Sequence, residues 1–104
     1  MNRVTIELWL WLGGELKGDF ESPSEMRSIR EEVVEEGTSI GDLLHSLANR
    51  YHPIRQRVFD IEDRRLRTDV VVTHNDRVTH PQTVLEQILK DGDKITIMPL
   101  YTGG

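Results

Sequence analysis

The strongest constraint on the fold is a strict alternation of residue character near the start of the chain. In residues 3–12 every second side chain is aliphatic, and the side chains between them are polar or tryptophan. The aliphatic set is Val4, Ile6, Leu8, Leu10 and Leu12. A period of two is typical of a β-strand with one apolar face. The sequence therefore predicts a strand over 3–12, ended by the glycine pair that follows it.

A helix is predicted after Ser39. This serine can cap the helix together with Asp42, three residues on, in a capping box. Apolar residues then recur at helical spacing and form one stripe, namely Ile40, Leu43, Leu44, Leu47 and Tyr51. Pro53 is expected to stop the helix, because the residue before a proline avoids helical backbone angles.

The remaining segments predict further strands joined by loops. Residues 29–36 are rich in Glu, but the valine pair and the glycine that follows favour a strand. Strands are also expected over 70–73, 77–79 and 94–98, because β-branched residues dominate the longer ones. Asn75-Asp76 and Asp91-Gly92-Asp93 are predicted turns. A long hairpin loop or a ragged extension of the hairpin is expected over 15–28. Loops are expected over 54–68 and 81–89, each with at most a helical turn.

The order of these elements predicts an α+β fold. The first and last strands are the most apolar, so we expect them to pair at the centre of a mixed four- to five-stranded sheet. This sheet would pack on one main helix. A chain of 104 residues fits a single domain over 1–104, with a tail over about 99–104.

Composition argues against several classes of function. The chain has no Cys, so a disulfide framework, a thiolate nucleophile and a cysteine metal site are excluded. A formal net charge of −5 does not favour nucleic acid as a partner. The spacing of the four histidines matches no zinc pattern, so no metal site is expected and the histidines are interpreted as surface residues. With neither an 18-residue apolar run nor a signal-peptide pattern, the expected location is cytoplasmic and no membrane contact is expected.

A candidate partner surface lies on the strand face opposite the aliphatic residues. Trp9 and Trp11 alternate with the core positions, and two exposed indoles would form an apolar interaction patch. Met98 and Leu100 are expected to extend it, since Ile95 and Ile97 have the opposite parity. The alternative is that residues 13–28 or Tyr101 fold over the two tryptophans.

The end of the chain carries a resemblance to a known family. Asp91-Gly92-Asp93, an apolar strand, Pro99 and a terminal Gly103-Gly104 resemble the ending of the MoaD/ThiS family of β-grasp, ubiquitin-like sulfur carriers. The entry to the helix at 37–40 and the turn at Asn75 agree with this resemblance. Residues 98–102 are most similar to the MoaD branch, the small subunit of molybdopterin synthase. The chain departs from the family pattern through the long segments 13–28 and 54–68 and through Leu100, where many MoaD members have a second proline.

The resemblance implies a role for the carboxylate of Gly104. An E1-like enzyme of the MoeB/ThiF type would adenylate it with ATP and Mg²⁺, and a sulfur donor would convert it to a thiocarboxylate. A synthase large subunit of the MoaE type would then receive the sulfur in molybdopterin (molybdenum or tungsten cofactor) biosynthesis. In that role the chain binds no cofactor itself and acts as a non-catalytic, sulfur-donating subunit.

The reacting tail is expected to comprise Pro99, Tyr101, Thr102, Gly103 and Gly104. Glycine lacks a Cβ atom, so it can pass through a narrow channel. Six extended residues reach about 20 Å, enough to enter a buried nucleotide site while the folded body stays outside. Three alternatives remain open: a sulfur carrier for thiamine or cysteine biosynthesis, a ubiquitin-like modifier conjugated through Gly104, and a plain binding module whose tail is never activated.

Overall fold

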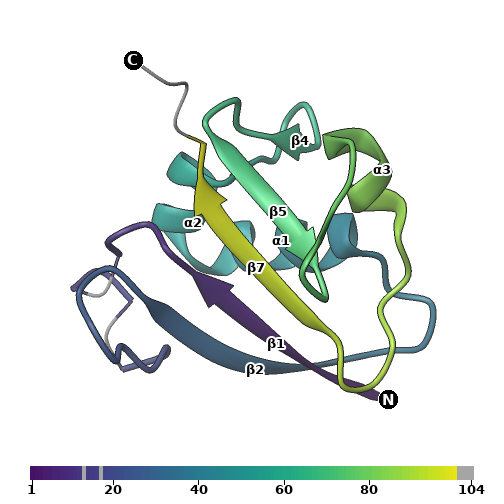
Figure 1. The fold of residues 1–104 in the computed structure, drawn as a ribbon, viewed down its shortest axis with the longest axis horizontal. Coiled ribbons are helices and arrows are strands. Elements are labelled where there is room, and N and C mark those ends of the chain that lie inside the picture. Colours follow the sequence, from purple (N-terminus) through teal and green to yellow (C-terminus); the bar gives the residue numbers. More distant parts are fainter. Residues whose placement is uncertain (13, 17, 101–104) are drawn as a thin grey trace.

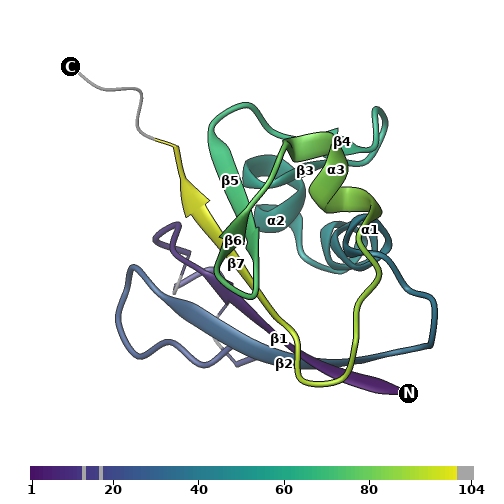
Figure 2. The ribbon, with the colours of Figure 1, turned by 45° about the vertical axis from the view of Figure 1, so that its right-hand side comes forward.

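The computed structural model describes residues 1–12, 14–16 and 18–100. In this part of the chain a mixed five-stranded sheet has the order β2-β1-β7-β5-β6 (Figure 1; β6 is labelled in Figure 2). Its strands are β1 (Asn2–Leu8), β2 (Ser28–Val34), β5 (Val70–His74), β6 (Arg77–Val78) and β7 (Lys94–Pro99). β1 and β7 run parallel to each other, and every other pairing is antiparallel. The predicted pairing of the first and last apolar strands inside the sheet is therefore confirmed.

The helices cover one face of this sheet (Figure 2). They are α1 (Ile40–Arg50), α2 (His52–Arg57) and α3 (Pro81–Glu86), and a small hairpin of β3 (Phe59–Asp60) and β4 (Arg65–Leu66) lies beside them. The arrangement is the predicted α+β fold with one main helix, α1. Among the described residues, none of these helices is long and apolar enough to cross a bilayer.

The core lies between α1 and the two parallel strands. The inward-facing side chains of β1 are Val4, Ile6 and Leu8, and those of β7 are Ile95 and Ile97. They meet the predicted apolar stripe of α1, of which Ile40, Leu43, Leu44 and Leu47 are fully buried and Tyr51 is partly buried. Burying such aliphatic side chains contributes about 1.5–3 kcal/mol each, so this interface is a large part of the driving force for folding.

The first strand is shorter than its sequence pattern predicts. Leu10 and Leu12 are buried, as expected, but β1 ends at Leu8. The reason is that its partner β2 begins at Ser28, opposite Leu8, and the chain before Ser28 turns through a bond from Arg27 N–H to the Ser24 carbonyl. Beyond Leu8 the regular ladder with β2 does not continue, and Trp11 adopts a left-handed conformation with φ of 58°.

The segment after β1 extends the hairpin irregularly, as one of its two predicted forms has it, and part of the segment enters the core. Backbone N–H groups of Leu16 and Phe20 donate to carbonyls four residues earlier. Both side chains are buried, and the Phe20 ring meets Tyr51 edge-on at 5.3 Å. Glu21 then bridges to Ile29 on the outer edge of β2. Residues 18–28 therefore belong to the folded body and lengthen its core.

The helix start is confirmed in detail. Ser39 Oγ accepts from Asp42 N–H at 3.0 Å, and the Asp42 carboxylate accepts from Ser39 N–H at 3.2 Å. The predicted stop is only partly right, because α1 ends at Arg50 and Pro53 lies in the first turn of α2. Proline suits that position, since the first turn leaves its backbone nitrogen without a required acceptor.

Candidate functional site

The root of the reacting tail lies at the end of β7. Pro99 is the last residue of the strand and pairs with Val70, and Leu100 N–H donates to the Asp69 carbonyl at 2.9 Å. Ordered pairing with β5 therefore reaches Leu100. The remaining predicted tail residues, Tyr101, Thr102, Gly103 and Gly104, lie outside the described residues.

The position of Pro99 follows from strand pairing. Backbone groups alternate between the two neighbours of a strand, and Leu100 N–H points towards β5. The nitrogen of Pro99 therefore points to the β1 side. There β1 has already ended, and its last bond runs from Trp9 N–H to the Ile97 carbonyl at 2.9 Å. A proline costs no ladder hydrogen bond at this place.

The face of the sheet opposite the helices carries a groove that we call the outer-face groove. It has a volume of about 330 Å³ and is lined by Glu7, Trp9, Thr73, Asp76, Val78, Lys94, Thr96 and Met98. Trp9 and Met98 thus share one surface, as their strand parity predicts. Its apolar side is completed by Val78 of the edge strand β6, which is exposed.

The two tryptophans differ in exposure. Trp9 is half-buried, and the guanidinium carbon of Arg27 lies 5.2 Å from the centre of its ring. The Trp11 side chain is on the surface, and the residue as a whole is 62% exposed. The backbone N–H of Trp11 donates to the Met26 carbonyl. Segment 18–28 therefore covers one indole and leaves the other on the surface.

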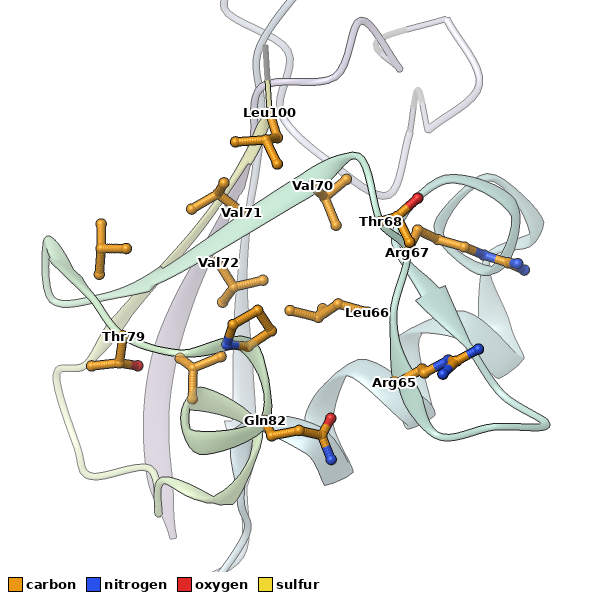
Figure 3. Close-up of a pocket in the computed structure, with 13 residues that line it drawn as sticks. Arg65, Leu66, Arg67, Thr68, Val70, Val71, Val72, Thr79, Gln82 and Leu100 are labelled. Carbon is orange, nitrogen blue, oxygen red and sulfur yellow. The ribbon is translucent and has the colours of Figure 1, made fainter. Parts of the chain in front are cut away.

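Leu100 lies in a second, adjoining groove of about 330 Å³ (Figure 3). We call it the Leu100 groove; its apolar lining includes Leu66, Val70, Val71, Val78 and Val84. Arg65 and Arg67 lie at its other side. Both arginines are engaged with acids, Arg65 with Asp63 at 3.5 Å and Arg67 with Asp60 at 3.7 Å. Val78 lines both grooves, so apolar surface continues from Trp9 towards the tail root.

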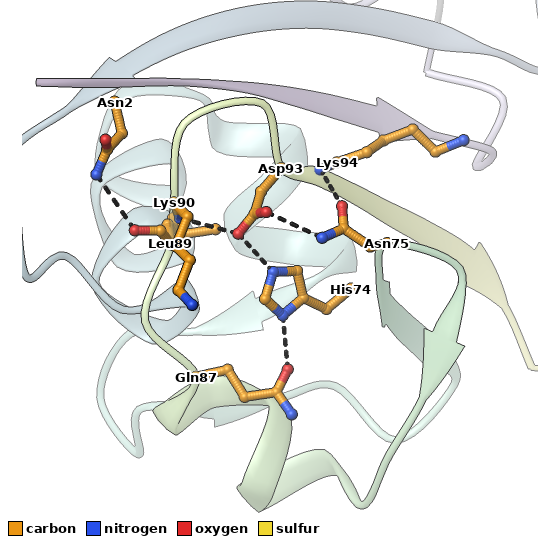
Figure 4. A network of polar contacts seen from close by, with 8 residues as sticks. All are labelled: Asn2, His74, Asn75, Gln87, Leu89, Lys90, Asp93 and Lys94. Carbon is orange, nitrogen blue, oxygen red and sulfur yellow. Dashed lines mark hydrogen bonds and ion pairs between the residues drawn. The ribbon is translucent and has the colours of Figure 1, made fainter.

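A buried polar network explains the two predicted turns (Figure 4). The Asp93 carboxylate accepts from Lys90 N–H at 2.9 Å and from the Asn75 side-chain amide at 2.9 Å, and it lies 2.7 Å from His74 Nε2. Asn75 in turn accepts from Lys94 N–H at 2.7 Å. The turn after β5 is thereby fastened to the turn before β7.

The network also sets the ionisation of Asp93. Burial by itself would raise the pKa of this carboxyl. The hydrogen bonds from Asn75, His74 and Lys90 favour the charged form more strongly, so the net pKa lies below its usual value. The second ring nitrogen of His74 lies 2.8 Å from Gln87 Oε1. His74 is therefore held inside the network, which corrects the prediction that all four histidines are surface residues.

Glycine and asparagine at these turns meet specific backbone demands. Asn75 and Asp76 have φ of 52° and 67°, as a type I′ hairpin turn requires at both central positions. Gly92 has φ of 88°, a conformation that glycine adopts without strain. No group of three His, Asp or Glu side chains in the described ranges is arranged to hold a metal ion.

Some residues of this surface were missed from the sequence. Strand parity places Glu7 beside Trp9 and Thr96 beside Met98, but neither Glu7 nor Thr96 is among the predicted partner-surface residues. The structure instead buries Glu7 to 5% exposure, with Arg27 Nε donating to its Oε1. This hydrogen bond raises the pKa of Arg27 above its ordinary value. No local signal predicted this pair, because Arg27 lies in the segment before the strand predicted over 29–36.

Comparisons with known proteins agree with this architecture. Small archaeal modifier protein 1 of Haloferax volcanii superposes with a TM-score of 0.71 at 18% identity, covering 97% of this chain and all of that one. A putative molybdopterin converting factor subunit 1 from Pyrococcus furiosus gives 0.67 at 21% identity, with coverages of 97% and 100%. A chain of the BexX/CysO complex of Amycolatopsis orientalis gives 0.63 at 25% identity, with coverages of 97% and 99%.

The sequence comparisons identify the family. No curated protein matched in sequence. The model of the ThiS family matches residues 20–104, which include the strands that hold the tail root and both turns of the polar network. The chain therefore belongs to the ThiS family of β-grasp, ubiquitin-like sulfur carriers.

Proposed function

We propose that this protein carries sulfur on the carboxylate of Gly104. The main support is that the match to the ThiS family runs through residue 104, while the described chain reaches the surface at Pro99 and Leu100. Pairing of the root with β5 gives the tail a fixed origin. The folded body can then dock while the residues beyond Leu100 reach into a partner.

The proposed chemistry needs no catalytic side chain from this protein. An E1-like enzyme of the MoeB/ThiF type supplies ATP and Mg²⁺. The Gly104 carboxylate attacks the α-phosphorus, pyrophosphate leaves, and an acyl-adenylate forms. A sulfur donor then displaces AMP at the carbonyl carbon, leaving a C-terminal thiocarboxylate. The body's task is to present the tail and to be recognised.

Molybdopterin biosynthesis is the proposed destination of the sulfur. Residues 98–102 resemble the tail of the MoaD branch, except that Leu100 stands where many of its members have a second proline. The Pyrococcus furiosus structure of the same fold is described as a putative molybdopterin converting factor subunit. The proposed acceptor enzyme is a synthase large subunit of the MoaE type. Transfer would place the thiocarboxylate in that subunit's active site.

Two other uses of the same tail have specific support. The CysO structure, at 25% identity, favours transfer of sulfur to another acceptor, as in cysteine or thiamine biosynthesis. The Haloferax volcanii modifier and Trypanosoma brucei Urm1, at 18% identity each, favour conjugation through Gly104 to other proteins. Each use shares the adenylation step and differs in what attacks afterwards.

Intact mass spectrometry tests the proposal. The full chain is incubated with the host's E1-like enzyme, ATP, Mg²⁺ and a sulfide source. A mass gain equal to exchange of one oxygen for one sulfur is expected, and a chain lacking Gly104 should show none. Adding the candidate large subunit and a pterin precursor should return the carrier to its original mass.

The outcomes separate the candidates. Return of the original mass only with an acceptor from another pathway would redirect the proposal to that pathway. Ladders of conjugates on other proteins would identify a modifier. If no activating enzyme of the host alters the mass of the chain, the carrier proposal is wrong.

A further inference from the structure

The β5–β6 hairpin opens beside the tail root. The pairing of β6 covers Thr73 and His74 of β5, and after Val78 the chain leaves the sheet to enter α3. The first half of β5, residues 70–72, therefore has β7 on one side and no described strand on the other. All three valines of this half line the Leu100 groove, which follows the open edge (Figure 3).

The backbone at this edge points towards the groove. The Asp69 carbonyl accepts from Leu100 N–H on the β7 side. Because bonding alternates along a strand, the backbone groups of Val70 and Val72 point the other way. His74, two residues further on, uses that same side to pair with β6. An open edge of this kind is a template for an added strand.

The groove suits aliphatic side chains. Its floor is formed by Leu66, Val72 and Val84, which are buried, and its rim includes the exposed Val78 and Leu100. Side chains of an added strand point to alternate faces, so every second one can enter this apolar space. A volume of about 330 Å³ accommodates a short segment and not a folded body.

The wall of the groove near the start of β5 is basic (Figure 3). Residues 50–67 hold six of the ten arginines of the chain and three acids, although the net charge of the whole chain is −5. Arg65 and Asp63 lie 3.5 Å apart and are both more than half exposed, and such a surface pair contributes at most about 1 kcal/mol. A carboxylate brought by a partner can therefore compete for Arg65.

The last turn of α2 adds positive charge beside this wall. Arg67, which lines the groove, donates from its guanidinium to the Arg55 carbonyl at 2.8 Å. Arg55 and Arg57 are exposed on this turn, and neither pairs with an acid in the part of the chain that the structure describes. The charge on this side of the molecule therefore favours an acidic occupant.

We propose that the Leu100 groove binds a short extended segment of a partner protein as an added strand on β5. The segment has aliphatic residues at alternate positions, with Asp or Glu next to them. Its backbone pairs with Val70 and Val72. Its aliphatic side chains pack over Leu66 and Val84, and its carboxylates approach Arg65 and the end of α2. This site goes beyond the proposed sulfur carrier role and does not depend on activation of the tail.

The edge strand β2 of a second copy has a similar composition but is a poorer occupant. Glu32 of β2 already pairs with Arg30 and Arg50. Glu21 bridges to Ile29 along the outer edge of the same strand. A second copy would also have to bring its whole folded body to an open edge only three residues long.

Titration of the ¹⁵N-labelled full chain with synthetic peptides tests the site. The probe Ac-Asp-Glu-Val-Thr-Val-Asp-Glu-NH₂ is expected to give saturable shifts at Val70, Val72 and Val78. The neutral peptide Ac-Asn-Gln-Val-Thr-Val-Asn-Gln-NH₂ and the polar peptide Ac-Asp-Glu-Ser-Thr-Ser-Asp-Glu-NH₂ should each bind at least about fivefold more weakly. Equal binding of the three peptides, or no binding of the first, would overturn the proposal.

Amide hydrogen exchange tests whether the probe adds a strand. The amides of Val70 and Val72 should exchange more slowly when the probe is bound, because they point towards the groove. The amide of Val71 faces β7 and should not change. A probe that is N-methylated at its three central residues should lose binding, since it lacks the donors. If the N-methylated probe binds as well as the first, the groove does not accept an added strand and the proposal is wrong.

A matched pair of variants tests the basic wall. Arg65→Gln should raise the Kd of the acidic probe about two- to fivefold and leave that of the neutral peptide unchanged. Arg3→Gln is the control, because Arg3 is also an exposed arginine paired with an acid but lies at the start of β1. Equal affinity of Arg65→Gln and the wild type for the acidic probe would contradict the proposal.

Other occupants of the groove give different results. Self-association of the chain through the same residues would overturn the proposal in favour of a second copy. Binding of the probe to Tyr101→Ser but not to the wild type would assign the groove to the chain's own tail, and the proposal would be wrong. A chain lacking Gly104 should bind the probe as the wild type does, so failure of the tail chemistry and failure of this site are distinguishable.

Discussion

At the residue scale, the structure explains why the turn before β7 has the sequence Asp-Gly-Asp. Asp93 accepts from the Lys90 backbone and from the Asn75 side chain, so it joins two turns that lie 18 residues apart in sequence. Gly92 supplies the positive φ that this turn needs. These residues hold the start of β7, and β7 carries the tail root at its other end. They are therefore positioning residues for the tail.

Replacing Asp93 with Asn should destabilise the fold and reduce its sensitivity to acid. The folded-state pKa of Asp93 is lowered, so its contribution is full above the unfolded value of about 3.9 and disappears as pH falls through the folded value. Loss of the charged acceptor should cost about 1–3 kcal/mol at neutral pH.

Urea unfolding of the wild type and Asp93→Asn between neutral pH and pH below 4 measures this effect. The difference in free energy of unfolding should shrink at the acidic end. Asp69→Asn, at an exposed position, is the control and should follow the wild type. A difference for Asp93→Asn that stays constant with pH would show that its ionisation does not stabilise the fold.

At the element scale, segment 18–28 shows how a stretch rich in polar residues becomes part of the body. Apolar packing holds one end of this segment, and an ion pair holds the other. Phe20 enters the core beside Tyr51, and Arg27 pairs with Glu7 on the opposite face of the sheet. The segment thus wraps from the helix side to the outer face and helps to shape the partner surface.

Phe20→Ala should therefore lower stability as a core substitution does. Truncating a buried phenylalanine costs about 3–5 kcal/mol, since both transfer free energy and packing are lost. Ser22→Ala, at an exposed position of the same segment, should change the free energy of unfolding by less than about 0.5 kcal/mol. Chemical denaturation of both variants measures the contrast, and equal stabilities would mean that the segment is not anchored in solution.

At the scale of the whole molecule, the tail begins from the middle of the sheet. β7 has β1 on one side and β5 on the other, and its inward residues Ile95 and Ile97 are fully buried. Pulling on the tail is thus resisted by two strand pairings and the core. In the proposed function, a partner therefore takes up the C-terminus without unfolding the carrier.

Native-state hydrogen exchange should reflect this arrangement. Amides of β7 are expected to be among the slowest to exchange and to open only with global unfolding. Amides of the short edge strand β6, which includes the exposed Val78, should exchange much faster. NMR-detected exchange measures both in one experiment. If the amides of β7 exchange as fast as those of β6, the prediction that β7 opens only with global unfolding is wrong.

The sequence by itself determined the features that depend on neighbours a few residues apart. Alternation at period two gave the buried face of β1, and helical spacing with Ser39 and Asp42 gave α1 and its cap. The two turns, and the family to which the chain belongs, could likewise be predicted from the sequence. Each depends on a short run of residues. These predictions of the fold are confirmed.

Only the tertiary structure decided which distant residues meet. The end of β1 at Leu8 depends on where β2 begins, and the burial of Glu7 depends on Arg27, 20 positions along the chain. His74 lies between Gln87 and Asp93 because the end of α3, the end of β5 and the turn before β7 converge there. Local patterns report burial and backbone preference, whereas strand register and long-range pairing are set by the packing of the whole chain.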